Sequence, residues 1–182
     1  MSKPTRYHPV LAVIHWLSAL LVITMLLMGL FVLKQMPNTD AKIPYLAIHM
    51  VVGLTILILT VVRIVVRFST KLPAPAKSGS VFLDMLGNVT HILLYMGMLA
   101  MGLSGMGIAS QAALMDIVFG RSGSPLPDNL YVFPSRIGHG YIALGILALI
   151  GLHLAGAAYH QFLLKDKLLL RMSPSKPKNE EK

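Results

Sequence analysis

Four long apolar runs, separated by shorter polar segments, dominate the chain. They cover residues 10–33, 45–68, 81–109 and 137–164. Each run reaches the roughly 20 residues that a helix needs to cross the hydrocarbon core of a bilayer. The pattern predicts an all-α fold, an integral membrane bundle of four helices. The first run is too long for the apolar part of a signal peptide and lacks a small-residue cleavage site, so it reads as a retained transmembrane helix.

The polar segments set the domain organisation. Residues 1–172 are expected to form a single transmembrane domain, and residues 173–182 a polar tail. The longest link, residues 111–135, is rich in proline and is expected to hold a short interfacial helix over 111–119. The composition after Lys165 cannot bury a core, which predicts that this segment is mobile.

Composition narrows the class of protein and the cofactors it can hold. Of the 182 residues, 55% are hydrophobic and only 13% are charged, which excludes a soluble globular domain. The chain contains no cysteine, so disulfides, iron–sulfur clusters and covalently attached haem are excluded. A haem in this chain would have to be b-type, held by side-chain ligands and packing.

The net charge of +9 is better explained by membrane topology than by binding to nucleic acid. Four spans put both termini on one side, and twelve of the basic residues lie there against four on the other side. Positive charge accumulates on the cytoplasmic side, so both termini are predicted to be cytoplasmic. The twelve are Lys3, Arg6, Arg63, Arg67, Lys71, Lys77, Lys165, Lys167, Arg171, Lys176, Lys178 and Lys182, and the four are Lys34, Lys42, Arg121 and Arg136.

The last apolar run carries two histidines, His139 and His153, fourteen residues apart. At 100° and 1.5 Å per residue, their side chains point within roughly 40° of each other and lie about 21 Å apart along the helix. An imidazole buried in lipid is costly without a partner, so such residues indicate a functional site. Two imidazoles on one face, one near each membrane surface, suit two stacked cofactors.

The other histidines fall into the same two depth layers. His49 lies near the outer surface with His139, whereas the inner half holds His15, His91, His153 and His160. This arrangement fits a bundle with two haems, each ligated by imidazoles from facing helices. Depth pairs His49 with His139, but it leaves His153, His91 and His160 all open as the partner of His15.

The fourteen-residue spacing recurs in the first two runs. Gly29 follows His15 by fourteen residues and is expected to lie against the outer haem. Arg63 follows His49 by fourteen residues and is expected to offer a guanidinium to the propionates of the inner haem. The small residues at 97–107 of the third run predict close contact with a neighbouring helix or a cofactor.

These residues together resemble the bacterial cytochrome b-561 family over roughly residues 7–172. The pattern consists of His15-Trp16 after a basic N-terminus, His49 with Gly53, the Val62, Arg63 and Arg67 motif, His139, His153 and His160, and the pair Lys165-Asp166. The chain is similar in particular to the small di-haem members known as superoxide oxidase, and more distantly to cytochrome subunits of hydrogenases and formate dehydrogenases.

The resemblance implies two haem b groups with iron bound by histidines. His15 and His153 would ligate the inner haem, and His49 and His139 the outer haem. It also implies a quinone site near His160, and His91 is a further candidate for a quinone or haem contact. The expected location is the bacterial inner membrane, as a multi-pass protein.

Three functions are compatible with this sequence. The first is an oxidoreductase that takes electrons from superoxide, or from a redox protein, on the periplasmic side and reduces ubiquinone. The second is an electron-transfer subunit of a dehydrogenase or hydrogenase complex that exchanges electrons with the quinone pool. The third is a transporter with histidine proton relays, which would be colourless. The expected partners are lipid, quinone and the electron donor, with no nucleic acid.

Overall fold

The computed structural model describes residues 4–120 and 122–174. Arg121 and most of the predicted tail, residues 175–182, lie outside the described residues. Within the described chain, four helices are long and apolar enough to cross a membrane, which confirms the all-α prediction. They are α1 (Pro9–Leu27, continued by a π-helical turn, Met28–Leu33), α2 (Ile43–Ser69), α3 (Val81–Gln111) and α5 (Pro134–Ala158, continued by a π-helical turn, Tyr159–Leu163).

Three of the four long helices begin one to three residues before the apolar run that predicts them. The fourth helix begins at Pro134 rather than at residue 137. Proline is favoured at the first helical position, because the amide that it lacks would have no partner there. Pro44 occupies the same part of α2, which begins at Ile43. These prolines therefore start helices that the apolar pattern places slightly later.

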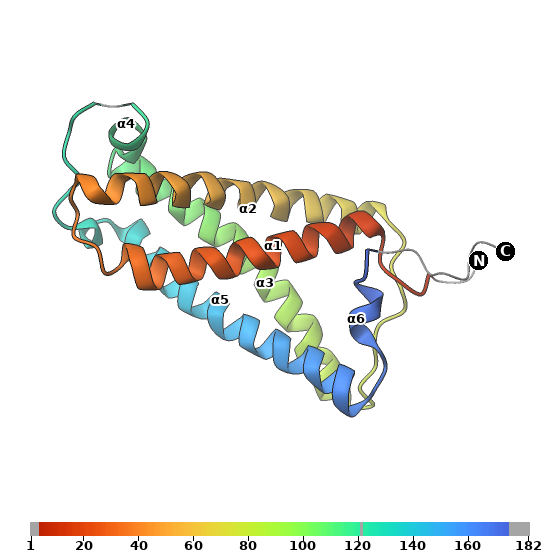
Figure 1. Cartoon of the computed structure of the whole chain (residues 1–182). Helices are drawn as coiled ribbons and strands as arrows, with labels where there is room; N and C mark the ends of the chain where they lie inside the picture. The colour runs from red at the N-terminus through yellow and green to blue at the C-terminus, as the bar shows by residue number, and fades with distance from the viewer. Residues whose placement is uncertain (1–3, 121, 175–182) are drawn as a thin grey trace.

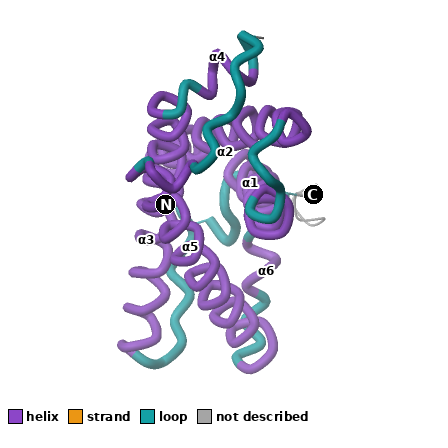
Figure 2. The backbone as a smooth tube through the Cα atoms, turned by 90° about the vertical axis from the view of Figure 1, so that its left-hand side faces the viewer, coloured by secondary structure: helices purple, strands orange, loops and turns teal. Residues whose placement is uncertain are grey.

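The four helices form two pairs, α1 with α2 and α3 with α5, which diverge toward the end that carries α6 (Figures 1 and 2). α1 packs on α2, α2 on α3, and α3 most closely on α5. In the described chain, α5 makes at most marginal backbone contact with α1 and with α2. Neighbouring helices in the chain therefore pack closely, whereas the backbone of α5 lies farther from α1 and α2.

Glycines on α3 account for its close packing. A Cβ atom on Gly102 would lie 2.8 Å from Leu57 of α2, and one on Gly107 would lie 2.6 Å from the hydroxyl of Ser135 on α5. Both distances are too short for a real side chain, so these positions let the backbones approach. The predicted role of the small residues in the third run is confirmed for these helix contacts.

One end of the bundle, here called the terminal end, is bound together by the C-terminal segment. The short helix α6 (Leu168–Arg171) lies across this end (Figure 1). The amide of Tyr7 donates to the carbonyl of Arg171, the indole of Trp16 donates to that of Met172, and Arg171 donates to the carbonyl of Ala74. The expectation that the chain after Lys165 is mobile is therefore wrong up to residue 172, because its backbone bonds tie it to the bundle.

The opposite end, here called the loop end, carries the links 34–42 and 112–133. The predicted interfacial helix is present as α4 (Leu114–Val118). Its buried side chains join a cluster that closes this end, formed by Leu46, Ile108, Ala112, Leu114, Ile117, Leu126 and Leu130. Short 3₁₀ turns, Asp40–Lys42 and Leu130–Val132, lead into α2 and α5.

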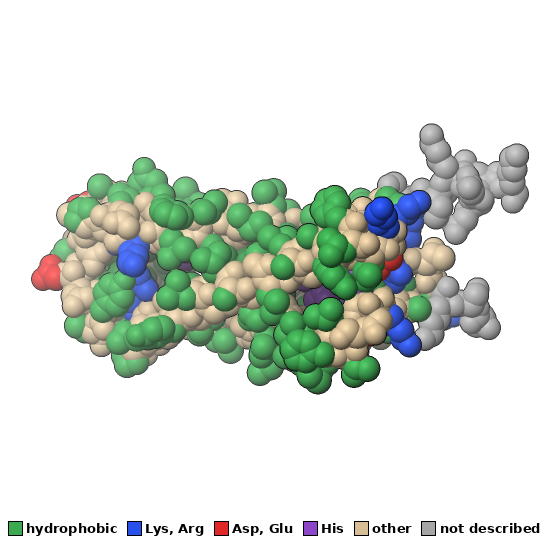
Figure 3. Space-filling model, turned by 90° about the horizontal axis from the view of Figure 1, so that it is seen from below, with side chains coloured by type: hydrophobic (Ala, Val, Ile, Leu, Met, Phe, Trp, Pro, Cys, Tyr) green, Lys and Arg blue, Asp and Glu red, His purple; other side chains and the backbone are tan. Residues whose placement is uncertain are grey.

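The surface matches a membrane environment. Hydrophobic side chains cover the long middle of the molecule, whereas Lys and Arg gather toward its two ends (Figure 3). Large apolar residues on every long helix are half exposed or more, among them Leu20, Leu54, Leu103 and Leu144. Such a band would be an aggregation liability in water and is favourable in hydrocarbon.

Candidate haem sites

The first histidine pair lies toward the loop end, here called the outer pair. His49 of α2 and His139 of α5 face each other with ring centroids 6.2 Å apart and an interplanar angle of 65°. The pairing expected from depth is therefore present.

The second pair lies toward the terminal end, here called the inner pair. His15 of α1 faces His153 of α5 with ring centroids 6.2 Å apart and an interplanar angle of 76°. Depth alone left three partners open for His15. The rotation of α5 places His153 opposite it, while His160 is engaged elsewhere.

The separation within each pair fits a metal ion between the rings. A histidine nitrogen binds a metal at about 2.0 Å, which puts two ring centroids on either side of one ion about 6.3 Å apart. Each pair offers only two ligands, and the described residues contain no cluster of three or more His, Cys, Asp or Glu for a bare metal ion. This donor set fits a haem, whose porphyrin brings the other four nitrogens.

The space around the outer pair also fits a haem. A cavity of about 1170 Å³ adjoins both rings and is somewhat larger than most small-molecule sites, as a bulky cofactor needs. Gly29, Gly53 and Gly105 line it, and a Cβ atom on Gly105 would lie 3.5 Å from His139. Gly29 lies in the π-helical turn of the first helix, where a Cβ atom would be 3.8 Å from His49. Gly29 therefore lies beside the outer pair, and its contact with a haem stays a prediction.

A serine orients one imidazole of the outer pair. The hydroxyl of Ser104 donates to the carbonyl of Met101 at 2.9 Å, so its oxygen is left to accept from Nδ1–H of His139 at 3.0 Å. This hydrogen bond favours the tautomer that carries its proton on Nδ1 and leaves the lone pair of Nε2 free to bind a metal. Such a partner usually fixes both the tautomer and the ring orientation of a metal-binding histidine.

The inner pair has a third imidazole beside it. The ring of His91, on α3, lies 5.1 Å from that of His153. Arg63 lies with its guanidinium 5.5 Å from the ring centroid of Tyr95, and its Nε is buried without a hydrogen-bond partner among the described residues. A partly buried cation with an unpaired N–H suits an anionic group such as a haem propionate, and this role for Arg63 stays a prediction from its spacing.

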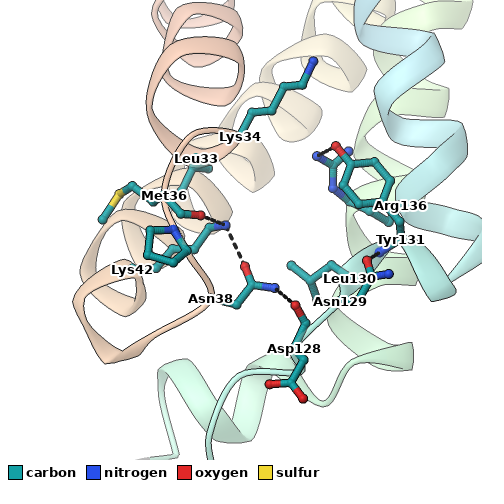
Figure 4. A pocket seen from close by; sticks show the side chains of 11 residues that line it. Leu33, Lys34, Met36, Asn38, Lys42, Asp128, Asn129, Leu130, Tyr131 and Arg136 are labelled. Carbon is teal, nitrogen blue, oxygen red and sulfur yellow. Dashed lines mark hydrogen bonds between the residues drawn. The ribbon is translucent and has the colours of Figure 1, made fainter.

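Three cations surround the entrance of the outer cavity. Lys34, Lys42 and Arg136 line both this cavity and a smaller pocket of about 220 Å³ at its mouth (Figure 4). None of the three forms an ion pair with a carboxylate in the described chain, and Figure 4 shows the carboxylate of Asp128 turned away from them. The sequence did not indicate this clustering, because Arg136 lies far along the chain from the link 34–42 that carries the two lysines.

Hydrogen bonds hold the two links at this mouth together. Lys42, only 6% exposed, donates to the carbonyl of Met36 at 3.0 Å and to the side-chain oxygen of Asn38 at 2.8 Å. The amide of Asn38 donates in turn to the carbonyls of Pro127 and Asp128. Lys42 is therefore a structural cation, whereas Lys34 is exposed and Arg136 stacks on the ring of Tyr131.

His160 lies beyond both pairs, at the terminal end. Its Nδ1 is 2.7 Å from Oδ2 of Asp166. Sequence reasoning noted the pair Lys165-Asp166 only as part of a motif and did not assign Asp166 a partner. It placed Ser104 only among the small residues of α3 and did not predict its hydrogen bond to His139.

Comparison with known proteins finds a family model and relatives that cover most of the chain. The family model described as prokaryotic cytochrome b561 matches residues 6–175. The chain is 30% identical over 177 residues to cytochrome b561 homolog 2 of Escherichia coli, covering 94% of this chain and 93% of that protein. It is 29% identical over 170 residues to the probable superoxide oxidase CybB of Yersinia pestis, covering 90% and 93% respectively.

Proposed function

The chain belongs to the prokaryotic cytochrome b561 family, and on this premise we propose that it carries electrons from superoxide to a quinone through two haem b groups. Family membership makes it a multi-pass membrane cytochrome of electron transport that binds b-type haem. The observation that carries the finer proposal is the presence of two opposed imidazole pairs, each 6.2 Å apart, at two levels of the bundle.

Each imidazole pair would hold one haem. His49 and His139 would bind the iron at the outer level, and His15 and His153 that at the inner level. A haem held by two imidazoles would supply one-electron storage rather than oxygen binding. Arg63 would neutralise a propionate of the inner haem, while Ser104 keeps His139 in the metal-binding tautomer.

The proposed location is the bacterial inner membrane, with the loop end in the periplasm. The described cations support this orientation, because the terminal end carries the larger share of lysine and arginine. Electrons would then enter at the loop end, beside the outer pair, and leave at the terminal end.

Superoxide is the donor that suits the mouth of the outer cavity. Lys34 and Arg136 offer positive charge without a paired carboxylate in the described chain, and an electropositive entrance raises the rate of encounter with a small anion. Two superoxide ions would each give one electron and leave as dioxygen. With one quinone and two protons, the products are two dioxygen molecules and one quinol, which balances electrons and charge.

The acceptor would be ubiquinone at the terminal end, near His160. This part of the chain holds the hydrogen-bonded His160 and Asp166, whereas no histidine of the described chain lines the pocket at the mouth of the outer cavity. Quinone reduction consumes protons and superoxide oxidation does not, so the two half-reactions fit opposite ends.

Mixing the purified, haem-loaded chain with superoxide tests this proposal. The Soret and alpha bands should shift to those of reduced haem after mixing. Decylubiquinone added afterwards should reoxidise the haem. Superoxide generated together with superoxide dismutase is the control and should leave the haem oxidised. Haem that quinol reduces but superoxide does not would remove the donor and favour the alternative, a cytochrome subunit docked to a dehydrogenase, which co-purification in mild detergent would reveal.

A further inference from the structure

A histidine and an aspartate are held together at the end of α5. Nδ1 of His160 and Oδ2 of Asp166 are 2.7 Å apart, within hydrogen-bond distance. Their side chains are only 16% and 24% exposed. A hydrogen bond of this length to a carboxylate is charge-assisted and about twice as strong as a neutral one.

The backbone between the two residues is shaped to bring them together. His160 lies in the π-helical turn Tyr159–Leu163, and such single turns occur often at functional sites. Lys165 and Lys167, on either side of Asp166, have φ of 56° and 55°, in the left-handed region that costs a lysine on the order of 1 kcal/mol. The amide of Asp166 donates back to the carbonyl of His160 at 3.3 Å. The two strained lysines therefore flank the residue that contacts His160, and their backbone conformation places Asp166 next to it.

Asp166 bonds to the histidine although lysines flank it in the sequence. Asp84, the other described acid at this end, accepts from the amide and hydroxyl of Ser78 and so stabilises the start of α3. Asp166 caps no helix. Its second oxygen, Oδ1, is buried without a hydrogen-bond partner in the described chain, which leaves an acceptor for a water or another proton carrier.

We propose that Asp166 is the positioning residue of a proton-delivering dyad with His160, acting on the quinone. This inference rests on the quinone acceptor of the proposed function. Asp166 holds Nδ1–H, which fixes the ring and leaves Nε2 as the nitrogen that faces the substrate oxygen. The carboxylate also stabilises the doubly protonated ring that must exist before each transfer.

Each electron that reaches the quinone is matched by one proton from His160. As an electron reaches the quinone, the Nε2–H bond of the protonated His160 breaks and an O–H bond forms on the quinone. The ring is left neutral, with Nδ1–H still bonded to Asp166, and takes a replacement proton from water at the terminal end. Two such rounds deliver the two electrons and two protons of a quinol.

Reoxidation of pre-reduced haem by decylubiquinone isolates this step from the electron donor. In a stopped-flow experiment on the full chain, Asp166→Asn should lower the saturating rate roughly tenfold or more while the half-saturating quinone concentration changes little. The solvent deuterium isotope effect should rise, because proton delivery becomes limiting. Asp166→Glu should restore part of the rate. The double variant Asp166→Asn with His160→Gln should be no slower than His160→Gln alone, because the two residues act as a unit.

Asp40→Asn is the matched control, since it removes an exposed carboxylate at the other end of the bundle. It should behave as the wild type. An Asp166→Asn variant with intact haem spectra and an unchanged saturating rate and isotope effect would overturn the dyad, and so would a double variant slowed by the product of the two single effects. Wild-type haem that decylubiquinone fails to reoxidise is a different result, which removes the quinone acceptor and the dyad together.

Discussion

The two histidine pairs share one geometry but lie in different surroundings. Both have ring centroids 6.2 Å apart, and both use a histidine of α5. Around the outer pair lie a large cavity, glycines and an entrance lined by cations. Around the inner pair lie a third imidazole, the partly buried Arg63 and, beyond them, the pair of His160 and Asp166.

This difference separates electron chemistry from proton chemistry. A small anion that gives up one electron needs an open, positively charged approach and no proton carrier. A quinone that gains electrons needs protons delivered to its oxygens. The same ligation can therefore serve both ends of the protein, and the surroundings decide which half-reaction takes place at each.

The largest expected effect comes from removing one ligand at a time. His49→Ala should lower the haem content from two per chain to one by loss of the outer haem, and His15→Ala should do the same at the inner level. A b-type haem is held by its two histidine ligands and by packing, so losing one ligand weakens its binding. A pyridine haemochrome assay measures the content, and superoxide should still reduce the haem that remains in His15→Ala but not in His49→Ala.

His91→Ala and His160→Ala are the matched controls for this comparison and should keep both haems. Loss of the inner haem from His91→Ala, with retention in His15→Ala, would transfer the ligand role to His91. The His91 control tests this directly, because its ring is the other imidazole beside His153, with ring centroids 5.1 Å apart.

A smaller effect should follow from charge reversal at the entrance. Lys34→Glu is expected to lower the second-order rate constant for haem reduction by superoxide about three- to tenfold at low ionic strength, because steering of an anion depends on local potential. Salt should shrink the difference, since charges at an exposed mouth are screened within about 10 Å at 0.1 M ionic strength.

Lys77→Glu makes the same charge change at an exposed site of the terminal end and should leave this rate constant unaltered. Equal slowing by the two variants would mean that net charge, and not the entrance, governs the encounter. Lys42 is unsuited to the test, because its hydrogen bonds to Met36 and Asn38 hold the loop end together.

A feature of the histidine sites could be predicted from the sequence when it depends on one helix, but not when it depends on how several helices pack. The fourteen residues between His139 and His153 set both depth and direction, because a helix has a fixed rise and turn. The partner of His15 could not be chosen in the same way. Three histidines lie at similar depth, and the rotation and order of whole helices select His153.

Features built from loops were beyond sequence reasoning for the same reason. Lys34 and Arg136 meet at the entrance only because Asn38 ties one link to the other. The segment after Lys165 looked mobile by composition, yet three leucines in α6 and bonds to Trp16 and Ala74 hold it across the terminal end. Asp166 gains its role from that turn, whose left-handed residues are lysines and carry no glycine signal.

The smallest expected effect distinguishes the two levels by potential alone. Ser104→Ala removes the acceptor of His139 Nδ1–H, which makes the imidazole a weaker donor to iron and favours the reduced state. A hydrogen bond worth about 0.5–1.5 kcal/mol corresponds to roughly 20–60 mV for one electron, so the midpoint potential of the outer haem should rise by that amount. Spectroelectrochemical titration should show the inner haem unchanged. Thr60→Ala, which removes a buried hydroxyl bonded only to its own helix, is the control. If both haems shifted equally, or neither did, Ser104 would not orient one ligand, and the contrast between the two levels would rest on the cavity and the charges alone.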